Sequence, residues 1–203
     1  MYNELCLIKP SATPGPTGYS NRFLYDYRNE LCVPLAMVFK NSVVNNIVPS
    51  DWRIADVIPI FKKGSKGLPS NYRPVSLTCV VGKVLERLIK KTIVKHLETN
   101  NLILPTQHGF MANKSCATNL LTMLEELTSA FDRGESYDII FYDFAKAFDK
   151  VPKERLLHKV EALGIKGQIL EWIRSWLTNR KQRTKVKNVY SRFTSVLPGV
   201  PQG

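Results

Sequence analysis

The chain has 203 residues, of which 44% are hydrophobic and 23% are charged, a balance that excludes a collagen-like, coiled-coil or wholly disordered protein. The 29 Lys and Arg residues outnumber the 17 Asp and Glu residues, and the net charge of +12 favours a polyanionic partner, above all nucleic acid. The alternative is a basic surface that is merely solvated.

The cysteines and the apolar stretches indicate a protein of the cell interior. The four cysteines, at positions 6, 32, 79 and 116, form no CxxC pair, so a zinc ribbon or thioredoxin site has no support. Such sparse use of cysteine is typical of a reducing compartment. The N-terminus has no apolar core of signal-peptide length, and the longest apolar stretch contains Pro34 and is too short to span a membrane. The sequence therefore predicts no membrane partner.

The first half of the chain predicts helices around two short strands. Prolines and glycines mark residues 10–18 as a loop, and residues 21–45 predict one or two helices around Pro34. Residues 56–61 and 75–80 read as short strands, separated by a glycine-containing loop over residues 62–71.

Two amphipathic helices follow. Residues 82–98 carry one apolar stripe, and a second stripe follows Ser115, which can act as the N-cap of a helix that ends at Gly134. Both stripes are predicted to lie in the core.

The last third mixes strands and helices. Residues 138–142 predict a strand with Asp143 at its C-terminal end, and Pro152 is well placed to start a helix that runs to Ala162. A helix over residues 168–177 and a hairpin within residues 182–197 complete an α/β or α+β chain. The final residues do not resemble the end of a natural domain, so the sequence predicts a fragment whose domain continues beyond Gly203.

The positive charge is concentrated near the C-terminus. From Trp172 to Gly203 there are seven basic residues and no acidic residue, whereas the preceding residues hold the other 22 basic and all 17 acidic residues. We expect this stretch to bind nucleic acid through four cations: Arg180, Lys181, Arg183 and Lys185.

Asp143 is the sharpest candidate for chemistry. A carboxylate at the C-terminal end of a buried strand faces a crevice in many sheets, and Mg²⁺ prefers carboxylate oxygens together with substrate phosphates. A strand-end turn residue is the alternative for Asp143. For Asp149, six residues later, a carboxylate in the first turn of a helix is the stronger reading.

Two loops are weaker candidates. The loop FKKGSK, followed by NYRP, places lysines and Arg73 near flexible glycines, which suits a triphosphate, although a solvated basic loop is the better reading of this segment alone. The segment PGVPQG has glycines on each side of Gln202 and suits backbone that lies against a ligand.

The order of these segments along the chain is more informative than any one of them alone. The series FKKGSKGLPSNYRPVSL, QHGF, FYDFAKAFDKV and PGVPQG resembles the reverse transcriptases of non-long-terminal-repeat retrotransposons, the jockey-like LINE group. The resemblance covers nearly the whole chain. It implies a right-hand polymerase fold with fingers and part of the palm, truncated before the Asp-Asp hairpin and the thumb. Residues 1–47 would be an extension or the start of the fingers, and residues 48–203 the incomplete reverse transcriptase domain.

The resemblance also implies roles for single residues. Asp143 would be the first metal-binding aspartate of the palm, and the remaining assignments concern the bound nucleotide. Phe144 would lie by the metal, Lys146 and Ala147 would offer backbone N–H groups, Phe148 would exclude a ribose 2′-hydroxyl, and Lys63, Arg73 and Gln202 would contact the nucleotide. The choice between Lys62 and Lys63 stays open.

The family implies two-metal nucleotidyl transfer with Mg²⁺ or Mn²⁺, an RNA template, a DNA primer and deoxynucleoside triphosphates, in the nucleus and cytoplasm. The chain departs from the family because no Asp-Asp pair occurs in its 203 residues. We therefore expect an inactive fragment of a polymerase. The alternatives are a non-catalytic nucleic-acid-binding remnant and a decayed, unfolded fragment; the oligomeric state is not predicted.

Overall fold

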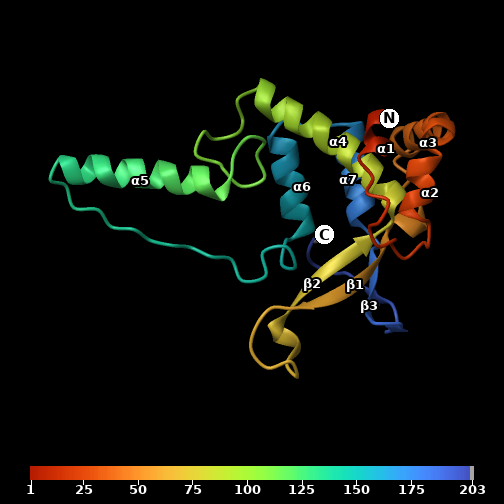
Figure 1. Cartoon of the computed structure of the whole chain (residues 1–203). Helices are drawn as coiled ribbons and strands as arrows, with labels where there is room; N and C mark the ends of the chain where they lie inside the picture. Colours follow the sequence, from red (N-terminus) through yellow and green to blue (C-terminus); the bar gives the residue numbers. More distant parts are fainter. Residues whose placement is uncertain (202–203) are drawn as a thin grey trace. The chain divides into compact units, whose positions relative to one another are not determined.

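A computed structural model of the chain describes residues 1–201, and they form two compact units (Figure 1). Unit 1 combines Met1–Ile93 with the segment from Lys146 onward, and unit 2 is Val94–Ala145. The helix α4, Val80–Thr99, begins in unit 1 and its last turns belong to unit 2. Each unit is described by itself.

Unit 1 contains most of the helices. Before the sheet come α1 (Tyr2–Cys6), α2 (Asn21–Asp26), α3 (Arg28–Val44) and the short 3-10 helix η1 (Ser50–Trp52). The side chain of Ser20 caps α2 by accepting a hydrogen bond from the Phe23 N–H, and α3 continues through Pro34. After residue 146 come α6 (Lys153–Ala162) and α7 (Gln168–Leu177), which confirm the two helices expected there.

The sheet of unit 1 joins strands from both ends of the chain. Its strands are β1 (Ile54–Phe61), β2 (Tyr72–Thr78), β3 (Lys181–Val186), β4 (Val189–Tyr190) and β5 (Thr194–Ser195). The order is β2-β1-β3-β4, and β5 also pairs with β3. β1 is antiparallel to β2 and parallel to β3, in a register that places Asp56 opposite Arg183. The two early strands and the late hairpin are thus confirmed, although Val80 belongs to α4 rather than to β2.

Helices cover one end of this sheet. In Figure 1, the loop over residues 62–71, which contains the 3-10 helix η2 (Pro69–Asn71), projects from β1 and β2 away from the helices. The main core lies where α1, α2, α3, α4 and α7 meet, and it includes Trp52. The Trp52 ring lies edge-on to Phe39 at a centroid distance of 5.8 Å, and its Cγ would lie 3.3 Å from a Cβ at Gly82. The predicted core stripe of α4 is confirmed by the burial of Leu85 and Ile89.

A smaller core fixes α6 against α7. It consists of the buried side chains of Leu157, Leu170 and Leu177. On the other side of α7, the Trp172 indole N–H donates to the Ser42 hydroxyl at 3.0 Å, and this bond ties α7 to α3. Because α7 leads directly into β3, these contacts position the late strands beside β1.

Unit 2 contains the helix α5, Cys116–Asp132. Ser115 is its N-cap, as expected, and the Ser115 and Thr118 side chains form a reciprocal capping box. The predicted core position of its stripe is wrong for this structure, because Leu120, Leu124 and Phe131 are all exposed. An apolar stripe is buried only where another element packs against it, and no described residue of unit 2 supplies such an element.

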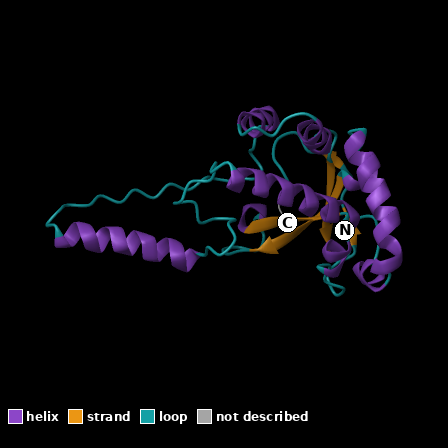
Figure 2. Cartoon of the chain, turned by 90° about the horizontal axis from the view of Figure 1, so that it is seen from above, coloured by secondary structure: helices purple, strands orange, loops and turns teal. Residues whose placement is uncertain are grey.

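The strand predicted over residues 138–142 is also absent from the described structure. Figure 2 shows the segment after α5 as a loop, and Phe141 and Tyr142 are 80% and 87% exposed. A strand needs a hydrogen-bonded neighbour, and no described strand pairs with this segment. None of the helices in residues 1–201 is both long enough and apolar enough to cross a membrane.

Candidate active site

Two motifs that are about fifty residues apart in the sequence meet in unit 1. The Val200 N–H donates to the Phe148 carbonyl, and the Gly199 N–H donates to the Val151 carbonyl, each at 2.9 Å. Gly199 has φ +90°, and a Cβ there would lie 2.7 Å from the Asp149 carbonyl oxygen. Both the backbone conformation and the close approach therefore require glycine at this position.

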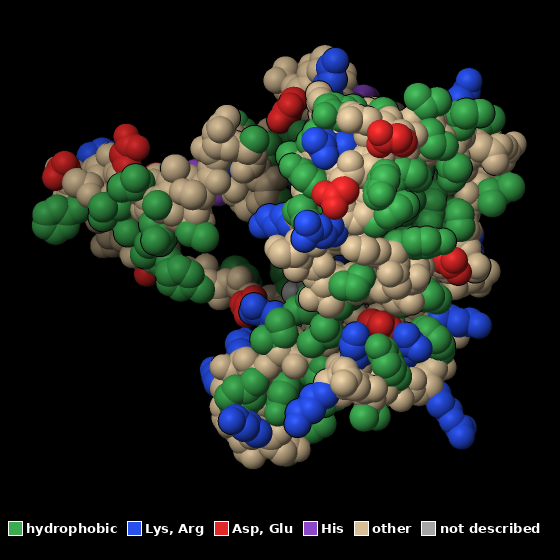
Figure 3. All heavy atoms as spheres, turned by 45° about the vertical axis from the view of Figure 1, so that its right-hand side comes forward, with side chains coloured by type: hydrophobic (Ala, Val, Ile, Leu, Met, Phe, Trp, Pro, Cys, Tyr) green, Lys and Arg blue, Asp and Glu red, His purple; other side chains and the backbone are tan. Residues whose placement is uncertain are grey.

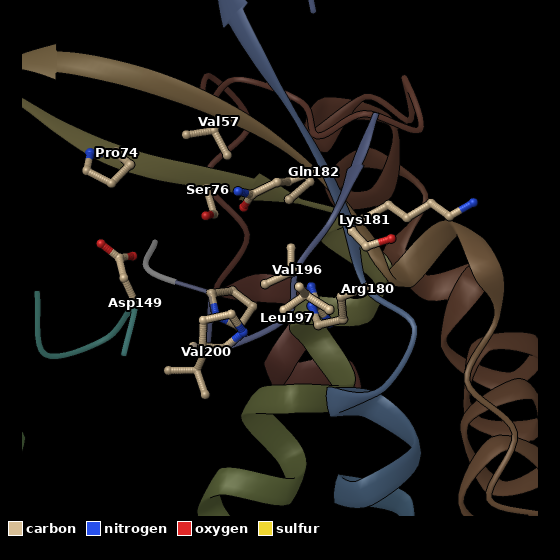
Figure 4. A pocket seen from close by; sticks show the side chains of 15 residues that line it. Val57, Pro74, Ser76, Asp149, Arg180, Lys181, Gln182, Val196, Leu197 and Val200 are labelled. Atoms are coloured by element: carbon tan, nitrogen blue, oxygen red, sulfur yellow. The ribbon is translucent and has the colours of Figure 1, made fainter. Parts of the chain in front are cut away.

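This junction forms part of a cavity of about 380 Å³ (Figure 4). The sheet contributes Pro74 and Ser76 from β2, Val57 from β1 and Gln182 from β3. The remaining wall consists of other residues of unit 1: Ala55, Asp149, Arg180, Lys181 and residues 195–201. The lining is about equally polar and apolar, and its charged groups are Asp149, Arg180 and Lys181.

Arg180 lies inside the unit, not on its surface. It is only 2% exposed, and its guanidinium lies 4.6 Å from the centroid of the Trp176 ring and donates to the Trp176 carbonyl. Burial lowers the pKa of Arg180, an effect that Glu86 opposes and Arg53 reinforces. The burial of Arg180 does not suit the nucleic-acid contact expected from the sequence, and the residue that it contacts here is Trp176 of α7.

Two neighbours of Arg180 respond to the same buried environment. Burial raises the pKa of Glu86, whereas Arg180 and the hydrogen bond from the Trp176 indole N–H at 3.1 Å act in the opposite direction. The Lys153 ammonium donates to the Val196 carbonyl at 2.9 Å, and its pKa is lowered by burial and by the charge of Arg180.

The loop that carries Lys63 is held in a defined shape by polar contacts. The Lys62 N–H donates to the Asn71 carbonyl at 2.8 Å, the Asn71 amide donates to the Ser65 carbonyl at 2.8 Å, and the Tyr72 hydroxyl donates to the Lys66 carbonyl at 2.9 Å. The Lys63 side chain is exposed. These contacts present the lysines of the loop to solvent rather than to the core.

Arg73 stands on β2 next to a residue of the cavity wall. Because side chains alternate along a strand, Pro74 and Ser76 lie on the face of β2 that lines the cavity, and Arg73 belongs to the other face. The structure thus places Arg73 beside the cavity wall without making it part of the lining.

Lys146, Ala147 and Phe148 are in unit 1, as are Lys63 and Arg73. The first three lie in a run of turns, and Lys146 has φ +54°, a left-handed conformation that non-glycine residues rarely adopt. Phe148 is half-buried. The structure therefore brings Phe148 together with the loop that precedes Gln202, while Gln202 itself lies outside the described residues.

Asp143 and Phe144 belong to unit 2, in the extended segment after α5. Both are exposed. The convergence of Asp143 with Arg73, Phe148 and Gln202 in one cleft stays a prediction.

Side chains that could bind a metal ion are dispersed over the part of the chain that the structure describes. Within residues 1–201, no three His, Cys, Asp or Glu side chains are grouped so that they could hold a metal ion. Asp143 is the single predicted metal ligand, and the exposed segment around it presents no second carboxylate that the sequence assigned to this role.

Arg183, Lys181 and Lys185 lie on β3, and Lys and Arg side chains gather over the part of unit 1 that contains the sheet (Figure 3). Arg183 is engaged within the protein, because its Nε donates to the Asp56 carboxylate at 2.7 Å. This ion pair raises the pKa of Arg183, chiefly through that hydrogen bond.

Sequence reasoning missed Asp56, Tyr190 and Phe193 as members of this cluster. The Arg183 guanidinium lies 4.1 Å from the Tyr190 ring centroid and 4.8 Å from that of Phe193. The usable signal was a cation at every second position from 181 to 187, followed by Tyr190, Arg192 and Phe193. The role of Asp56 was not visible, because it depends on the parallel pairing of β1 with β3.

Comparison with known proteins agrees with the motifs. Residues 60–203 match the family described as reverse transcriptase (RNA-dependent DNA polymerase). The chain is 30% identical over 193 residues to a probable RNA-directed DNA polymerase from transposon BS of Drosophila melanogaster, with 94% of this chain and 21% of that protein covered.

Other relatives come from related mobile elements. Identity is 29% over 197 residues to the RNA-directed DNA polymerase from mobile element jockey of Drosophila funebris, covering 97% of this chain and 21% of the relative. It is 26% over 157 residues to a Pol polyprotein from the type-1 retrotransposable element R2 of Popillia japonica, covering 77% and 22%. The chain thus spans about a fifth of the length of the curated relatives that it matches.

Proposed function

Because the chain belongs to the reverse transcriptase family, we propose that it forms the fingers and part of the palm of an RNA-directed DNA polymerase from a jockey-like mobile element. The match over residues 60–203 carries this proposal. The polymerase domain would begin near residue 48, with residues 1–47 as an extension or the start of the fingers. The protein would act in the nucleus and cytoplasm.

The proposed substrates are an RNA template, a DNA primer and deoxynucleoside triphosphates. The net charge of +12 supports polyanionic substrates. The cavity supports a nucleotide nearby, since Asp149 of the turn and the loop over residues 196–201 line it together with residues of β1, β2, β3 and β5.

The proposed nucleotide contacts are divided between the turn and the fingers. Lys146 and Ala147 would offer backbone N–H groups to the triphosphate, and the left-handed conformation of Lys146 suits a backbone that turns such groups toward an anion. Phe148 would exclude a ribose 2′-hydroxyl, and its carbonyl bond to Val200 supports a fixed position for its backbone.

Lys63, Arg73 and Gln202 are proposed as further nucleotide contacts, and Asp143 as one metal-binding carboxylate with the main chain of Phe144 beside it. A divalent ion such as Mg²⁺ would activate the primer 3′-hydroxyl and stabilise the pyrophosphate leaving group. Nucleotidyl transfer needs more carboxylates than Asp143, so we expect the isolated chain to make no measurable DNA.

The proposal is tested in a chimera in which this chain replaces the matching segment of the Drosophila funebris jockey polymerase. The chimera should extend a DNA primer on RNA, and Phe148→Ala should lower its preference for deoxynucleotides over ribonucleotides by at least roughly ten-fold. Phe141→Ala, which removes an exposed ring in unit 2, is the matched control and should leave the preference unchanged. Unaltered discrimination in Phe148→Ala, with synthesis intact, would contradict the assigned role.

A further inference from the structure

The hairpin side of the sheet exposes two aromatic rings in basic surroundings. Tyr190, on β4, is 44% exposed, and Phe193, just before β5, is 43% exposed. They lie on opposite sides of Ser191, whose hydroxyl accepts a hydrogen bond from the Thr184 N–H of β3 at 2.9 Å. That bond attaches the segment that carries both rings to the sheet.

A single guanidinium supports both rings. Arg183 lies within cation–π distance of Tyr190 and Phe193, and it is held by the Asp56 carboxylate, whose side chain is only 5% exposed. A charge that is paired with a buried carboxylate does not reorient easily. Tyr190 and Phe193 are therefore held on a rigid base while nearly half of each side chain faces solvent.

The side chains around the rings carry positive charges that are accessible to a ligand. Lys181, Lys187 and Arg192 are exposed, and none of them forms an ion pair with a described residue. Lys185 lies 5.3 Å from the Tyr190 ring centroid. The sequence from Trp172 onward contains no acidic residue, and the Asp56 carboxylate on β1 is already paired with Arg183.

We propose that Tyr190 and Phe193 form a stacking surface for the unpaired bases of single-stranded nucleic acid, with Lys181, Lys187 and Arg192 contacting the flanking phosphates. Exposed rings combined with a positive groove are the usual means of binding single strands without sequence preference. The bases of a duplex are already stacked on each other and offer no free face. Arg183 is a positioning residue here rather than a phosphate contact.

This inference rests on the proposed function for its class of partner, but it concerns the other end of β3. The cavity is lined by Lys181 and Gln182 near the start of β3, whereas Tyr190 pairs with Lys185 near its end. Loss of the rings should therefore affect strand binding rather than nucleotide selection.

The test measures binding of the full chain to a twelve-nucleotide RNA at several salt concentrations. Tyr190→Ala and Phe193→Ala should each weaken binding roughly 5- to 150-fold, as expected for the loss of one base–aromatic stack. The slope of log affinity against log salt should not change, because no charge is removed. Lys187→Ala should instead reduce the magnitude of that slope by about 0.7.

Matched variants separate stacking from other effects. Tyr190→Phe and Phe193→Tyr keep a ring and should bind as the parent does. Tyr19→Ala removes an exposed ring, 55% accessible, elsewhere in unit 1 and should have no effect. Each variant is compared by circular dichroism with the parent chain.

A second comparison replaces the RNA with an abasic strand of the same length, which keeps the phosphates but has no bases to stack. The unmodified chain should bind it more weakly than RNA, and the ring deletions should not weaken that binding further. Equal binding of both strands, an equal loss in the ring deletions for both strands, or no detectable binding of RNA by the parent chain would overturn the inference. If the ring deletions bind RNA as the parent does while the chimera still synthesises DNA, only this inference is contradicted. If binding depends on the rings while the chimera makes no DNA, only the polymerase proposal is contradicted.

Discussion

Gly199 is the residue at which the loop before Gln202 meets the turn after Asp143. A side chain at this position would meet two obstacles: the φ of +90°, and a Cβ only 2.7 Å from the Asp149 carbonyl oxygen. A shift that removes one of them does not remove the other. The two backbone hydrogen bonds of the junction depend on this approach.

Gly199→Ala should therefore lower the free energy of unfolding by about 1–3 kcal/mol and loosen the junction. Urea denaturation measures the first effect, and hydrogen exchange of the Val200 amide measures the second. Gly67→Ala is the matched control, because the nearest heavy atom to its Cβ is 3.8 Å away and its φ is not in the left-handed region. Equal stability of the two variants would show that the loop tolerates a side chain at Gly199.

Glu86 gives unit 1 a dependence on pH. Burial raises its pKa above the ordinary value of 4.5, so the folded chain holds this proton more tightly than the unfolded chain does. The free energy of unfolding should then fall as pH rises from about 4.5 through the raised pKa, and it should be flat with respect to this group below and above that window.

Glu86→Gln removes the titrating group and keeps an oxygen that can accept the Trp176 hydrogen bond. Its stability relative to the parent should increase as pH rises through the same window, as measured by urea denaturation at several pH values. Glu98→Gln, on the exposed end of the same helix, should follow the parent. A stability difference between Glu86→Gln and the parent that does not vary with pH would contradict the raised pKa.

At the level of elements, the sequence predicted well those helices, strands and caps that depend on residues close together in the chain. The strand over residues 56–61, the cap at Ser115 and the helices after Pro152 depend on neighbouring residues, and the structure confirms them. The pairing of Asp56 with Arg183 could not be predicted, because the parallel register of β1 and β3 is set by how α7 packs on α3. The predicted burial of the α5 stripe and the predicted strand before Asp143 are wrong for a related reason. Both features need a packing or pairing partner, and no described residue provides one.

The segment after α5 should be open to proteases for the same reason. Limited chymotrypsin digestion of the folded chain should cut first near Phe141, Tyr142 and Phe144, which are each at least 80% exposed. Trp172, at 2% exposed, should be cut only after unfolding. Protection of the three aromatic residues, as followed by mass spectrometry, would mean that the segment has found a neighbouring strand.

For the whole molecule, the excess positive charge and the division into two units set the context of the site. Unit 1 holds the sheet, the cavity and the basic C-terminal stretch, whereas Asp143 belongs to unit 2. The chain also spans about a fifth of the length of its relatives. The proposed chemistry therefore requires that Asp143 lie beside the junction of residues 148–151 with residues 198–200 in the working polymerase.

The most direct test of this requirement is primer extension on RNA by the jockey chimera carrying Asp143→Asn. The substitution removes a negative charge from an exposed segment and has little to disturb in the fold, so we expect synthesis to be abolished by loss of a metal-binding carboxylate. Asp138→Asn, at another exposed aspartate in the same segment, is the matched control and should retain the synthesis of the chimera. Substantial DNA synthesis by Asp143→Asn would contradict the assignment of Asp143 to the catalytic site.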